Sequence, residues 1–309
     1  MRRALLEHFP LAMMVSVLCT ALVCCSPTRT EQIELPAISV ETVTIDTPLR
    51  TLHLGRAPHI SQETTRAENA PLAAYLSKQL GLRVDLVVPS DYDTVTSELA
   101  SGAIDVAILP PLLYVIAKKR TPDLTLIAQL VVEGGGQFLS YIVTAADAPV
   151  HSLADLKGKR FAFVDKFSTT GYLLPLDLLS GSAIEPNRDF ARVVFAGSHP
   201  EVVKLVITHK VDAGAIASTT FRQMRDARLK ERLRILAKSD PVPCDAVVVR
   251  PNLPPEIVAK IRDTLLSLST RTDEGRAVLD GATTTNGFIP VTDDAYDSVR
   301  GIAVRIDDR

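Results

Sequence analysis

The apolar positions along this chain divide it into short buried strands that alternate with amphipathic helices. Runs of Val, Ile, Leu and Ala with the length of buried strands recur from residue 51 onward, for example at 84–88, 106–109, 213–216 and 246–249. Between these runs, apolar residues recur at helical spacing, and Gly, Pro, Ser or Asp stands at the ends. Such alternation predicts an α/β fold in which helices cover a mostly parallel sheet. Because the pattern occurs twice in succession, we expect two α/β lobes.

Capping residues place several helix boundaries. We expect one helix to begin near Asn69, with Pro71 in its first turn, and to end at Gly81. Either Ser90 or Asp91 caps the next helix. Further helices are predicted over 200–208, 219–227, 254–269 and 293–304.

The segment with the clearest candidate chemistry is the turn after the predicted strand 160–164. Ser168, Thr169 and Thr170, followed by Gly171, stand where this strand gives way to a helix. The first turn of a helix offers unpaired N–H groups and the positive end of the helix dipole, and hydroxyls add further donors. Glycine lets an anion approach the backbone closely. The turn can therefore bind a phosphate or carboxylate, although an ordinary helix cap is the commoner use of such residues.

Composition and charge narrow the classes of function. The chain has 309 residues, of which 46% are hydrophobic and 23% are charged, and its formal net charge is -2. This length fits two domains of usual size. The near-neutral charge and the lack of Lys/Arg runs argue against nucleic-acid binding. The chain shows no HExxH or GxGxxG motif, no Cys–His cluster and no Ser-His-Asp spacing. We therefore expect no metal, no cofactor and no enzymatic activity.

The N-terminus has the pattern of a targeting segment. Arg2 and Arg3 precede an apolar run over 11–23, which has signal-peptide length and is too short to span a bilayer comfortably. Leu22 lies three residues before Cys25, a spacing that resembles the lipobox of bacterial lipoproteins.

We expect residues 1–24 to be a lipoprotein signal peptide and Cys25 to become the lipidated N-terminus. Cys24 is an unusual residue before the cleavage point, so lipidation at Cys24 and a plain secretory signal remain alternatives. Residues 25–48 are polar, contain three prolines and predict a tether between lipid and domain.

Five separated segments together resemble one protein family. They read P-S-D-Y at 89–92, S-G-A-I-D-V-A at 101–107, F-S-T-T-G-Y-L-L-P at 167–175, A-G-S-H-P-E at 196–201 with V-D-A-G-A at 211–215, and G-F-I-P-V-T-D-D-A-Y-D-S-V-R at 287–300. In this order they resemble the phosphonate/phosphate/phosphite-binding family of ABC-transporter substrate-binding proteins, which has the type II periplasmic-binding fold.

The resemblance implies a two-lobed α/β architecture with a hinge and a central ligand cleft. Residues 49–137 plus 242–309 would form lobe 1, and residues 138–241 would form lobe 2. Binding would close the cleft about two chain crossings.

The resemblance also implies an anion-binding set. It assigns the anion to Ser168, Thr169, Thr170 and the Gly171 amide, and adds Tyr92, His199 and Asp245 to the same pocket. The Tyr92 phenol would donate from the opening turn of a helix, and His199 from a loop before Pro200. Asp245 could accept a bond from a protonated ligand oxygen. A half-buried Tyr, a surface loop His and a solvent-facing Asp are the alternatives.

The matched positions predict which ligands the pocket prefers. None of the residues assigned to the pocket is Lys or Arg, so neutral donors and helix ends would hold the anion. Family members that take an aminoalkylphosphonate have an acidic residue after the strand matching 211–216, whereas this chain has Ala217, Ser218, Thr219 and Thr220. Leu109 is expected to add an apolar wall. The sequence therefore favours phosphate, phosphite or a short alkylphosphonate, with Asp245 as a possible partner for an amine.

The resemblance thus implies a lipid-anchored binding protein in the cell envelope, facing the periplasm or cell exterior. It would capture a small phosphorus oxyanion and deliver it to an ABC permease and its ATPase. Two other classes of function stay open. A sensor would present the same bound state to a signalling receptor, and an enzyme on this fold would need His199 as its general base.

Overall fold

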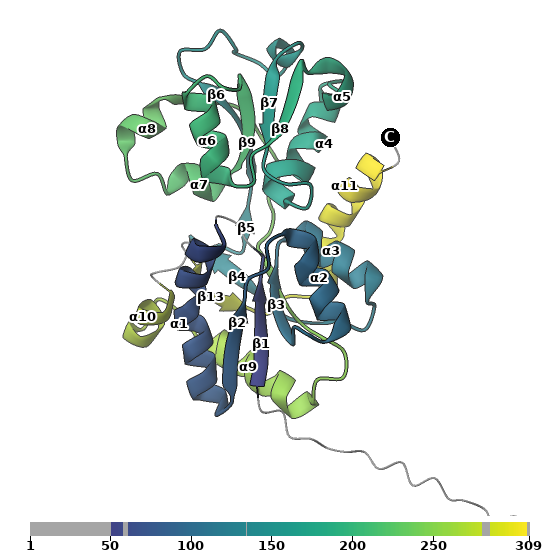
Figure 1. Cartoon of the computed structure of the whole chain (residues 1–309), viewed down its shortest axis with the longest axis vertical. Coiled ribbons are helices and arrows are strands. Elements are labelled where there is room, and N and C mark those ends of the chain that lie inside the picture. The colour runs from purple at the N-terminus through teal and green to yellow at the C-terminus, as the bar shows by residue number, and fades with distance from the viewer. Residues whose placement is uncertain (1–50, 58–60, 134, 280–284, 308–309) are drawn as a thin grey trace, which may run out of the picture. The chain divides into compact units, whose positions relative to one another are not determined.

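The computed structural model describes residues 51–57, 61–133, 135–279 and 285–307, within a compact unit that spans 48–309. The predicted signal peptide, the tether and Cys25 lie outside the described residues. Two separate β-sheets with flanking helices make up the unit (Figure 1).

The first sheet has six strands in the order β13-β4-β12-β3-β1-β2. Their bounds are β1 (Thr51–Arg56), β2 (Arg83–Val87), β3 (Val106–Leu109), β4 (Thr125–Val132), β12 (Ala246–Val249) and β13 (Thr285–Ile289). β1 pairs in parallel with β2 and β3, whereas β12 is antiparallel to both β3 and β4, and β13 is antiparallel to β4. This sheet is therefore mixed, and only one side of it has the parallel pairing expected from the sequence.

The second sheet has five strands in the order β10-β6-β9-β7-β8. They are β6 (Ser140–Ala145), β7 (Arg160–Phe163), β8 (Arg192–Phe195), β9 (Ala213–Ala217) and β10 (Leu233–Lys238). Here β7 is parallel to β8 and β9, and β6 is antiparallel to β9 and β10.

The chain passes between the two sheets twice, at a short antiparallel ribbon. β5 (Gln137–Phe138) leads into the second sheet, and its partner β11 (Val242–Pro243) returns the chain to the first. The predicted lobe boundaries lie at this ribbon, although the two-lobe division itself stays a prediction.

Helices cover both faces of the first sheet, because its strands are apolar on both sides. One face packs against α1 (Gln62–Leu80), α9 (Pro255–Ser267) and α10 (Asp273–Leu279). The other face packs against α2 (Tyr92–Ser101), α3 (Pro111–Arg120) and the turn η3 (Asp293–Tyr296). Successive residues of β3 enter opposite clusters, since side chains alternate across a strand: Ile108 joins the first and Leu109 the second.

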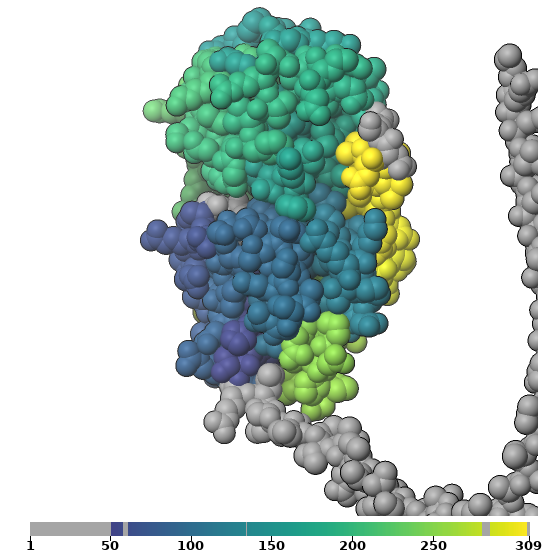
Figure 2. All heavy atoms as spheres, turned by 45° about the vertical axis from the view of Figure 1, so that its right-hand side comes forward, coloured from purple at the N-terminus to yellow at the C-terminus, as the bar shows by residue number. Residues whose placement is uncertain are grey.

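The second sheet is covered in the same way. α6 (His199–Ile207), α7 (Ser218–Arg222) and α8 (Ala227–Glu231) follow one another along the chain, and α6 packs against β6, β7 and β9. The opposite face carries η1 (Ala154–Leu156) and α4 (Leu174–Gly181), and the short helix α5 (Pro186–Asp189) follows α4 along the chain. The last helix, α11 (Asp297–Asp307), contacts both α3 and α4 and is the yellow element in Figure 2.

Several boundaries differ from the sequence prediction. α1 begins at Gln62, where Ser61 Oγ accepts a hydrogen bond from Thr64 N, so Pro71 lies inside the helix. The burial of the α1 residues Leu72, Ala73 and Leu76 stabilises the helix across this proline. The predicted helix 219–227 is two short helices, α7 and α8. α10 and β13 had no sequence prediction.

The close packing of α6 on the second sheet depends on Gly214 of β9. A Cβ atom at this position would lie 2.5 Å from Val202 Cγ1 and 3.0 Å from the Ala162 carbonyl oxygen. Gly214→Ala is expected to lower the free energy of unfolding by about 1–3 kcal/mol through overpacking. Gly181→Ala is the matched control, because a Cβ there meets no atom within 4 Å and should change stability by no more than about 0.5 kcal/mol. Urea denaturation measures both, and equal effects would contradict the packing argument.

Candidate functional site

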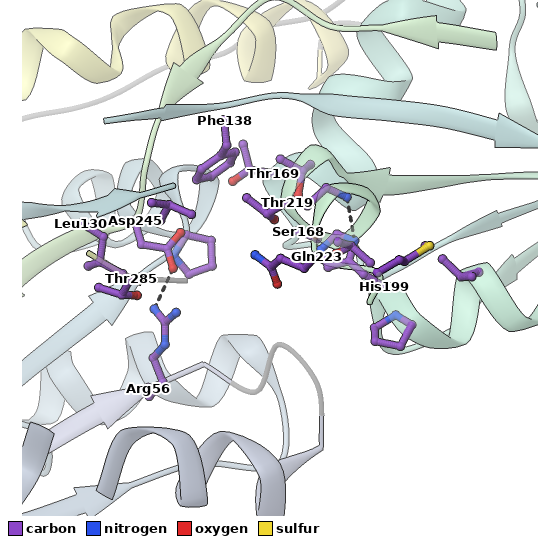
Figure 3. Close-up of a pocket in the computed structure, with 18 of the residues that line it drawn as sticks. Arg56, Leu130, Phe138, Ser168, Thr169, His199, Thr219, Gln223, Asp245 and Thr285 are labelled. Atoms are coloured by element: carbon purple, nitrogen blue, oxygen red, sulfur yellow. Dashed lines mark hydrogen bonds and ion pairs between the residues drawn. The ribbon is translucent and has the colours of Figure 1, made fainter. Parts of the chain in front are cut away.

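A pocket of about 380 Å³ is lined by residues of both sheets and their loops. Six of the seven ligand residues predicted from the sequence line it, namely Tyr92, Ser168, Thr169, Thr170, His199 and Asp245. Figure 3 shows Ser168, Thr169 and His199 on one side, with Arg56 and Asp245 on the other. The structure thus brings together residues that are up to 153 positions apart in the sequence (from 92 to 245).

The hydroxyl residues occupy a wide turn, η2 (Thr169–Leu173), that follows β7 and leads into α4. Ser168 caps this turn, and its Oγ accepts a hydrogen bond of 3.0 Å from Gly171 N. The Oγ1 of Thr169 accepts a bond of 2.9 Å from Leu112 N in the first turn of α3. Because both oxygens act as acceptors here, their hydroxyl protons remain donors that can point to a ligand.

Thr170 differs from its two neighbours. Its side chain is 5% exposed, and its hydroxyl makes no hydrogen bond with the described part of the chain. A hydroxyl that lines a pocket and has no partner in the protein is available to a bound oxyanion.

Gly171 has a different position from the one expected. It does not line the pocket, and its N–H donates to Ser168 Oγ within the turn. A Cβ atom at Gly171 would lie 2.4 Å from Val164 Cβ, and the Gly171 carbonyl accepts a bond from Val164 N. Its amide as an anion donor stays a prediction, but the structure gives this glycine a packing role.

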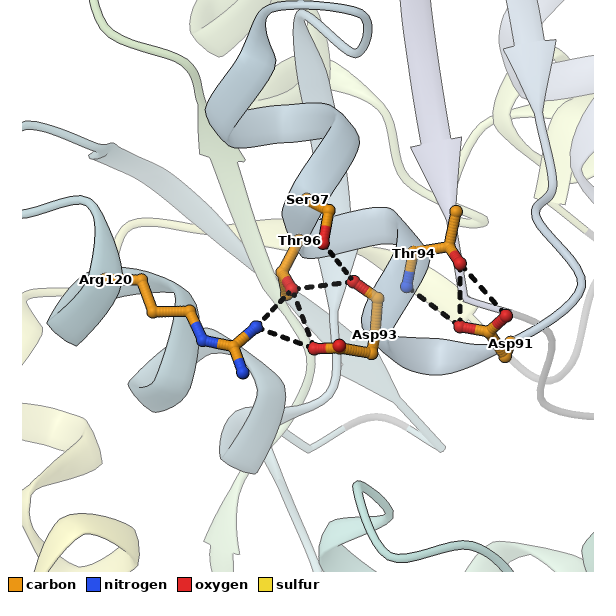
Figure 4. A network of polar contacts seen from close by, with 6 residues as sticks. All are labelled: Asp91, Asp93, Thr94, Thr96, Ser97 and Arg120. Carbon is orange, nitrogen blue, oxygen red and sulfur yellow. Dashed lines mark hydrogen bonds and ion pairs between the residues drawn. The ribbon is translucent and has the colours of Figure 1, made fainter.

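Tyr92 is the first residue of α2, whose start is fixed by two carboxylates. Asp91 caps the helix by accepting from Thr94 N, and Asp93 pairs with Arg120 of α3 (Figure 4). The Tyr92 side chain lines the pocket and is 4% exposed, and its hydroxyl makes no hydrogen bond with the described residues. Burial raises the pKa of Tyr92, and the charges of Asp165 and Asp245 raise it further. The phenol therefore stays protonated, and toward an anion it can act only as a hydrogen-bond donor.

His199 begins α6, not a preceding loop as the sequence suggested, because Ser198 caps the helix. Its Nδ1 accepts a hydrogen bond of 3.1 Å from Ala217 N at the end of β9. This bond places the proton of the neutral ring on Nε2, which makes Nε2 a donor. With Nδ1 engaged by the backbone, the ring is oriented by the fold and is poorly suited to act as a mobile general base.

Asp245 lies between β11 and β12 and forms an ion pair that the sequence analysis missed. Its Oδ2 accepts a bond of 2.7 Å from Nη1 of Arg56, the last residue of β1. The two side chains are 17% and 7% exposed, so the pair is largely buried. Tyr296 fixes the neighbouring backbone, since its hydroxyl donates to the Cys244 carbonyl. Arg56 stands at the carboxyl end of a parallel strand, where the ligands of open α/β sheets bind. This position was the one signal in the sequence that Arg56 could be a site residue.

The remaining wall of the pocket is mostly apolar. Leu130, Phe138 and Met224 line it, together with Ala217, Thr219 and Thr220. The expected wall residue Leu109 does not line the pocket: it is fully buried between the sheet and its helices, and Pro110 lines the pocket. The cause is the pleat of β3, which turns the Leu109 side chain into the core.

Two kinds of functional feature are absent within 51–57, 61–133, 135–279 and 285–307. No group of three or more His, Cys, Asp or Glu side chains there is placed to hold a metal ion. None of the helices in these ranges is both long enough and apolar enough to cross a membrane.

Comparison with known proteins gives the family. The model of a family described as "ABC transporter, phosphonate, periplasmic substrate-binding protein" matches residues 54–296. The phosphate-import protein PhnD of Mycolicibacterium smegmatis is 28% identical over 271 residues, which are 82% of this chain and 84% of the relative. The phosphonates-binding periplasmic protein of Escherichia coli is 26% identical over 238 residues, covering 75% of this chain and 70% of the relative.

Among solved structures, PhnD1 of Prochlorococcus marinus in complex with methylphosphonate matches with a TM-score of 0.77 and 22% identity. The match covers 84% of this chain and 99% of PhnD1, and it confirms the predicted α/β fold of periplasmic binding proteins. Because the family model covers most of its length, the chain belongs to the periplasmic substrate-binding proteins of phosphonate ABC transporters.

Proposed function

We propose that this protein binds phosphate, phosphite or a small phosphonate in the pocket and delivers it to an ABC permease and its ATPase. The observation that carries the proposal is the convergence of the Tyr92 and Thr170 hydroxyls, which have no partner among the described residues, with Ser168 and His199. These groups can all donate hydrogen bonds, and oriented donors in a partly buried pocket stabilise an oxyanion. The family consists of periplasmic substrate-binding proteins of ABC transporters, so we propose binding without catalysis.

We propose that the two lobes, residues 49–137 plus 242–309 and residues 138–241, close on the ligand about the β5–β11 ribbon. The ribbon is where the chain crosses between the sheets. The hydroxyl turn belongs to one lobe, whereas Tyr92 and Asp245 belong to the other. A ligand that contacts both sides would bind the closed arrangement more tightly and so shift the population toward it.

Loss of single hydroxyls tests this function. Tyr92→Phe and Thr170→Ala are each expected to cost about 1–3 kcal/mol of phosphate or methylphosphonate binding, because a buried ligand oxygen loses its donor. Ser168→Ala should cost a similar amount of binding, and about 1 kcal/mol of stability from the lost cap. Isothermal titration calorimetry gives the affinities.

Tyr296→Phe is the matched control for Tyr92→Phe. The Tyr296 hydroxyl donates to the Cys244 carbonyl inside the protein, so its loss should lower the unfolding free energy by about 1–3 kcal/mol. Tyr92→Phe should leave stability within about 0.5 kcal/mol of the parent, since no protein hydrogen bond is lost. If all three pocket variants bound with unchanged affinity, the proposed anion site would be wrong.

We further propose that the pocket discriminates against ligands with an amine. Asp245 is the only carboxylate among the described residues that line the pocket, and Arg56 already neutralises it. Thr219 and Thr220 offer an ammonium group only dipoles, and a desolvated cation without a counter-charge is costly. Leu130, Phe138 and Met224 suit a methyl or short alkyl group instead.

A competition titration measures this preference. Methylphosphonate, phosphite or phosphate is expected to displace 2-aminoethylphosphonate, because only the amine has to leave water without a partner. Tighter binding of the aminoethyl ligand than of the other three would show that the amine finds a carboxylate in the bound state.

We also propose that the mature protein is anchored in the cell envelope by a lipid on Cys25. The support comes from the sequence, where Leu22 stands at the lipobox spacing and a polar segment follows.

Cys25→Ser is expected to release the protein from the membrane fraction, since two lipid chains or more are needed for a stable anchor and the variant would carry none. Fractionation of cells that express the full chain measures this, with Cys24→Ser as the control. A Cys25→Ser protein that stays in the membrane pellet would contradict the assignment.

A further inference from the structure

Arg56 brings a buried positive charge into a pocket that the sequence predicted to hold none. Nη1 of Arg56 donates to Asp245 Oδ2 at 2.7 Å and is 3.5 Å from the Ile108 carbonyl oxygen. Its Nε is buried and has no hydrogen-bond partner among the described residues. Arg56 is only 6% exposed, and it is the only Lys or Arg among the described residues that line the pocket.

An aspartate without such a partner would restrict the ligand. An ionised carboxylate can only accept hydrogen bonds, so it tolerates a nearby oxyanion only if the ligand supplies a proton on oxygen. A ligand without that proton would place two negative oxygens against each other in a poorly solvated pocket. A lone Asp245 would therefore select protonated oxyanions.

The ion pair removes this restriction. Asp245 is compensated by a guanidinium group with which it makes a short, charge-assisted hydrogen bond. Arg56 also keeps a donor group beyond Nη1, since its Nη2 makes no hydrogen bond with the described residues. A guanidinium fork can bind a carboxylate and an oxyanion at the same time, because its five N–H groups point in different directions.

We propose that Arg56 is a specificity-determining residue that allows the pocket to bind a phosphonate or phosphite with no proton on any oxygen. The inference rests on the proposed function, because it concerns the same pocket and ligand. It goes beyond that function because it states that one residue determines which protonation states of the ligand can bind.

Two probes separate the alternatives at a single pH above the second pKa of both acids. Under this condition methylphosphonate has no proton on oxygen, whereas inorganic phosphate keeps one. Arg56→Met leaves Asp245 unpaired, and only phosphate can then donate to it. The ratio of phosphate to methylphosphonate affinity should rise roughly 10- to 100-fold in this variant, as expected for a buried charged group left without a donor.

Two control variants test whether the change in the affinity ratio arises from the Arg56–Asp245 ion pair. Arg56→Met combined with Asp245→Asn should return the ratio close to the wild-type value, because the asparagine amide can donate to a proton-free oxygen. Arg250→Met is the matched control: Arg250 Nε pairs with the buried Asp105 at 2.7 Å in the same sheet but does not line the pocket. It should leave the ratio unchanged even if it lowers stability.

Isothermal titration calorimetry on the wild-type protein and the three variants measures the affinities and distinguishes the outcomes. If Arg56→Met weakened the binding of both probes equally, their affinity ratio would not change. That result would overturn the inference while the proposed function stands. If Arg56→Met fails to fold, the ratio of phosphate to methylphosphonate affinity in the wild-type protein tests the inference. Methylphosphonate binding 10- to 100-fold weaker than phosphate binding would then overturn it. Failure of the wild-type protein to bind either probe would overturn the proposed function as well.

Discussion

The arrangement of the site depends on the close contact between the turn at 168–173 and the end of β7. Gly171 makes this contact possible, because any side chain there would collide with Val164. The same contact lets the Gly171 N–H reach Ser168 Oγ and brings Thr169 Oγ1 to the amide of Leu112 at the start of α3. Three successive hydroxyl residues are thereby held almost fully buried. Backbone donors fix the oxygens of Ser168 and Thr169, so their protons are left for another acceptor, whereas the Thr170 hydroxyl has no partner among the described residues. The turn is a helix cap and a candidate anion site at once, so the two interpretations of its sequence do not exclude each other.

The charged residues of the pocket contribute differently from its neutral hydrogen-bond donors. The donors of the proposed anion site carry no charge, namely Tyr92, Thr170 and the Nε2 of His199. In the proposed function they recognise an oxyanion by the directions of their hydrogen bonds. Arg56 and Asp245 add one charge of each sign and compensate each other at 2.7 Å. The net effect is a pocket that can hold an anion without a strong attraction for every anion in solution. The wall formed by Leu130, Phe138 and Met224 is apolar and offers no charged group to a ligand.

Features set by neighbouring residues could be predicted from the sequence, and features set by distant contacts could not. The Gly81 end of α1 and a cap at Ser90 or Asp91 depend on local backbone geometry and are visible in the sequence, and the structure gives the cap to Asp91. The Arg56–Asp245 pair joins residues 189 positions apart, and no local pattern indicates it. Leu109 was expected to line the pocket, but its side chain lies in the core and Pro110 lines the pocket instead. One step along the chain is enough to move a side chain from the pocket to the core. The resemblance to a family supplied the pocket residues that periodicity could not group.

The central claim is that the pocket between the hydroxyl turn and the Arg56–Asp245 pair is where this protein binds its ligand. A crystal structure of the protein with methylphosphonate tests it most directly. The account predicts phosphonyl oxygens within hydrogen-bond distance of the Tyr92 and Thr170 hydroxyls, one oxygen facing Arg56, and the methyl group against the apolar wall. A phosphonate bound outside this pocket, or bound inside it with no contact to Tyr92, Ser168 or Thr170, would contradict the account.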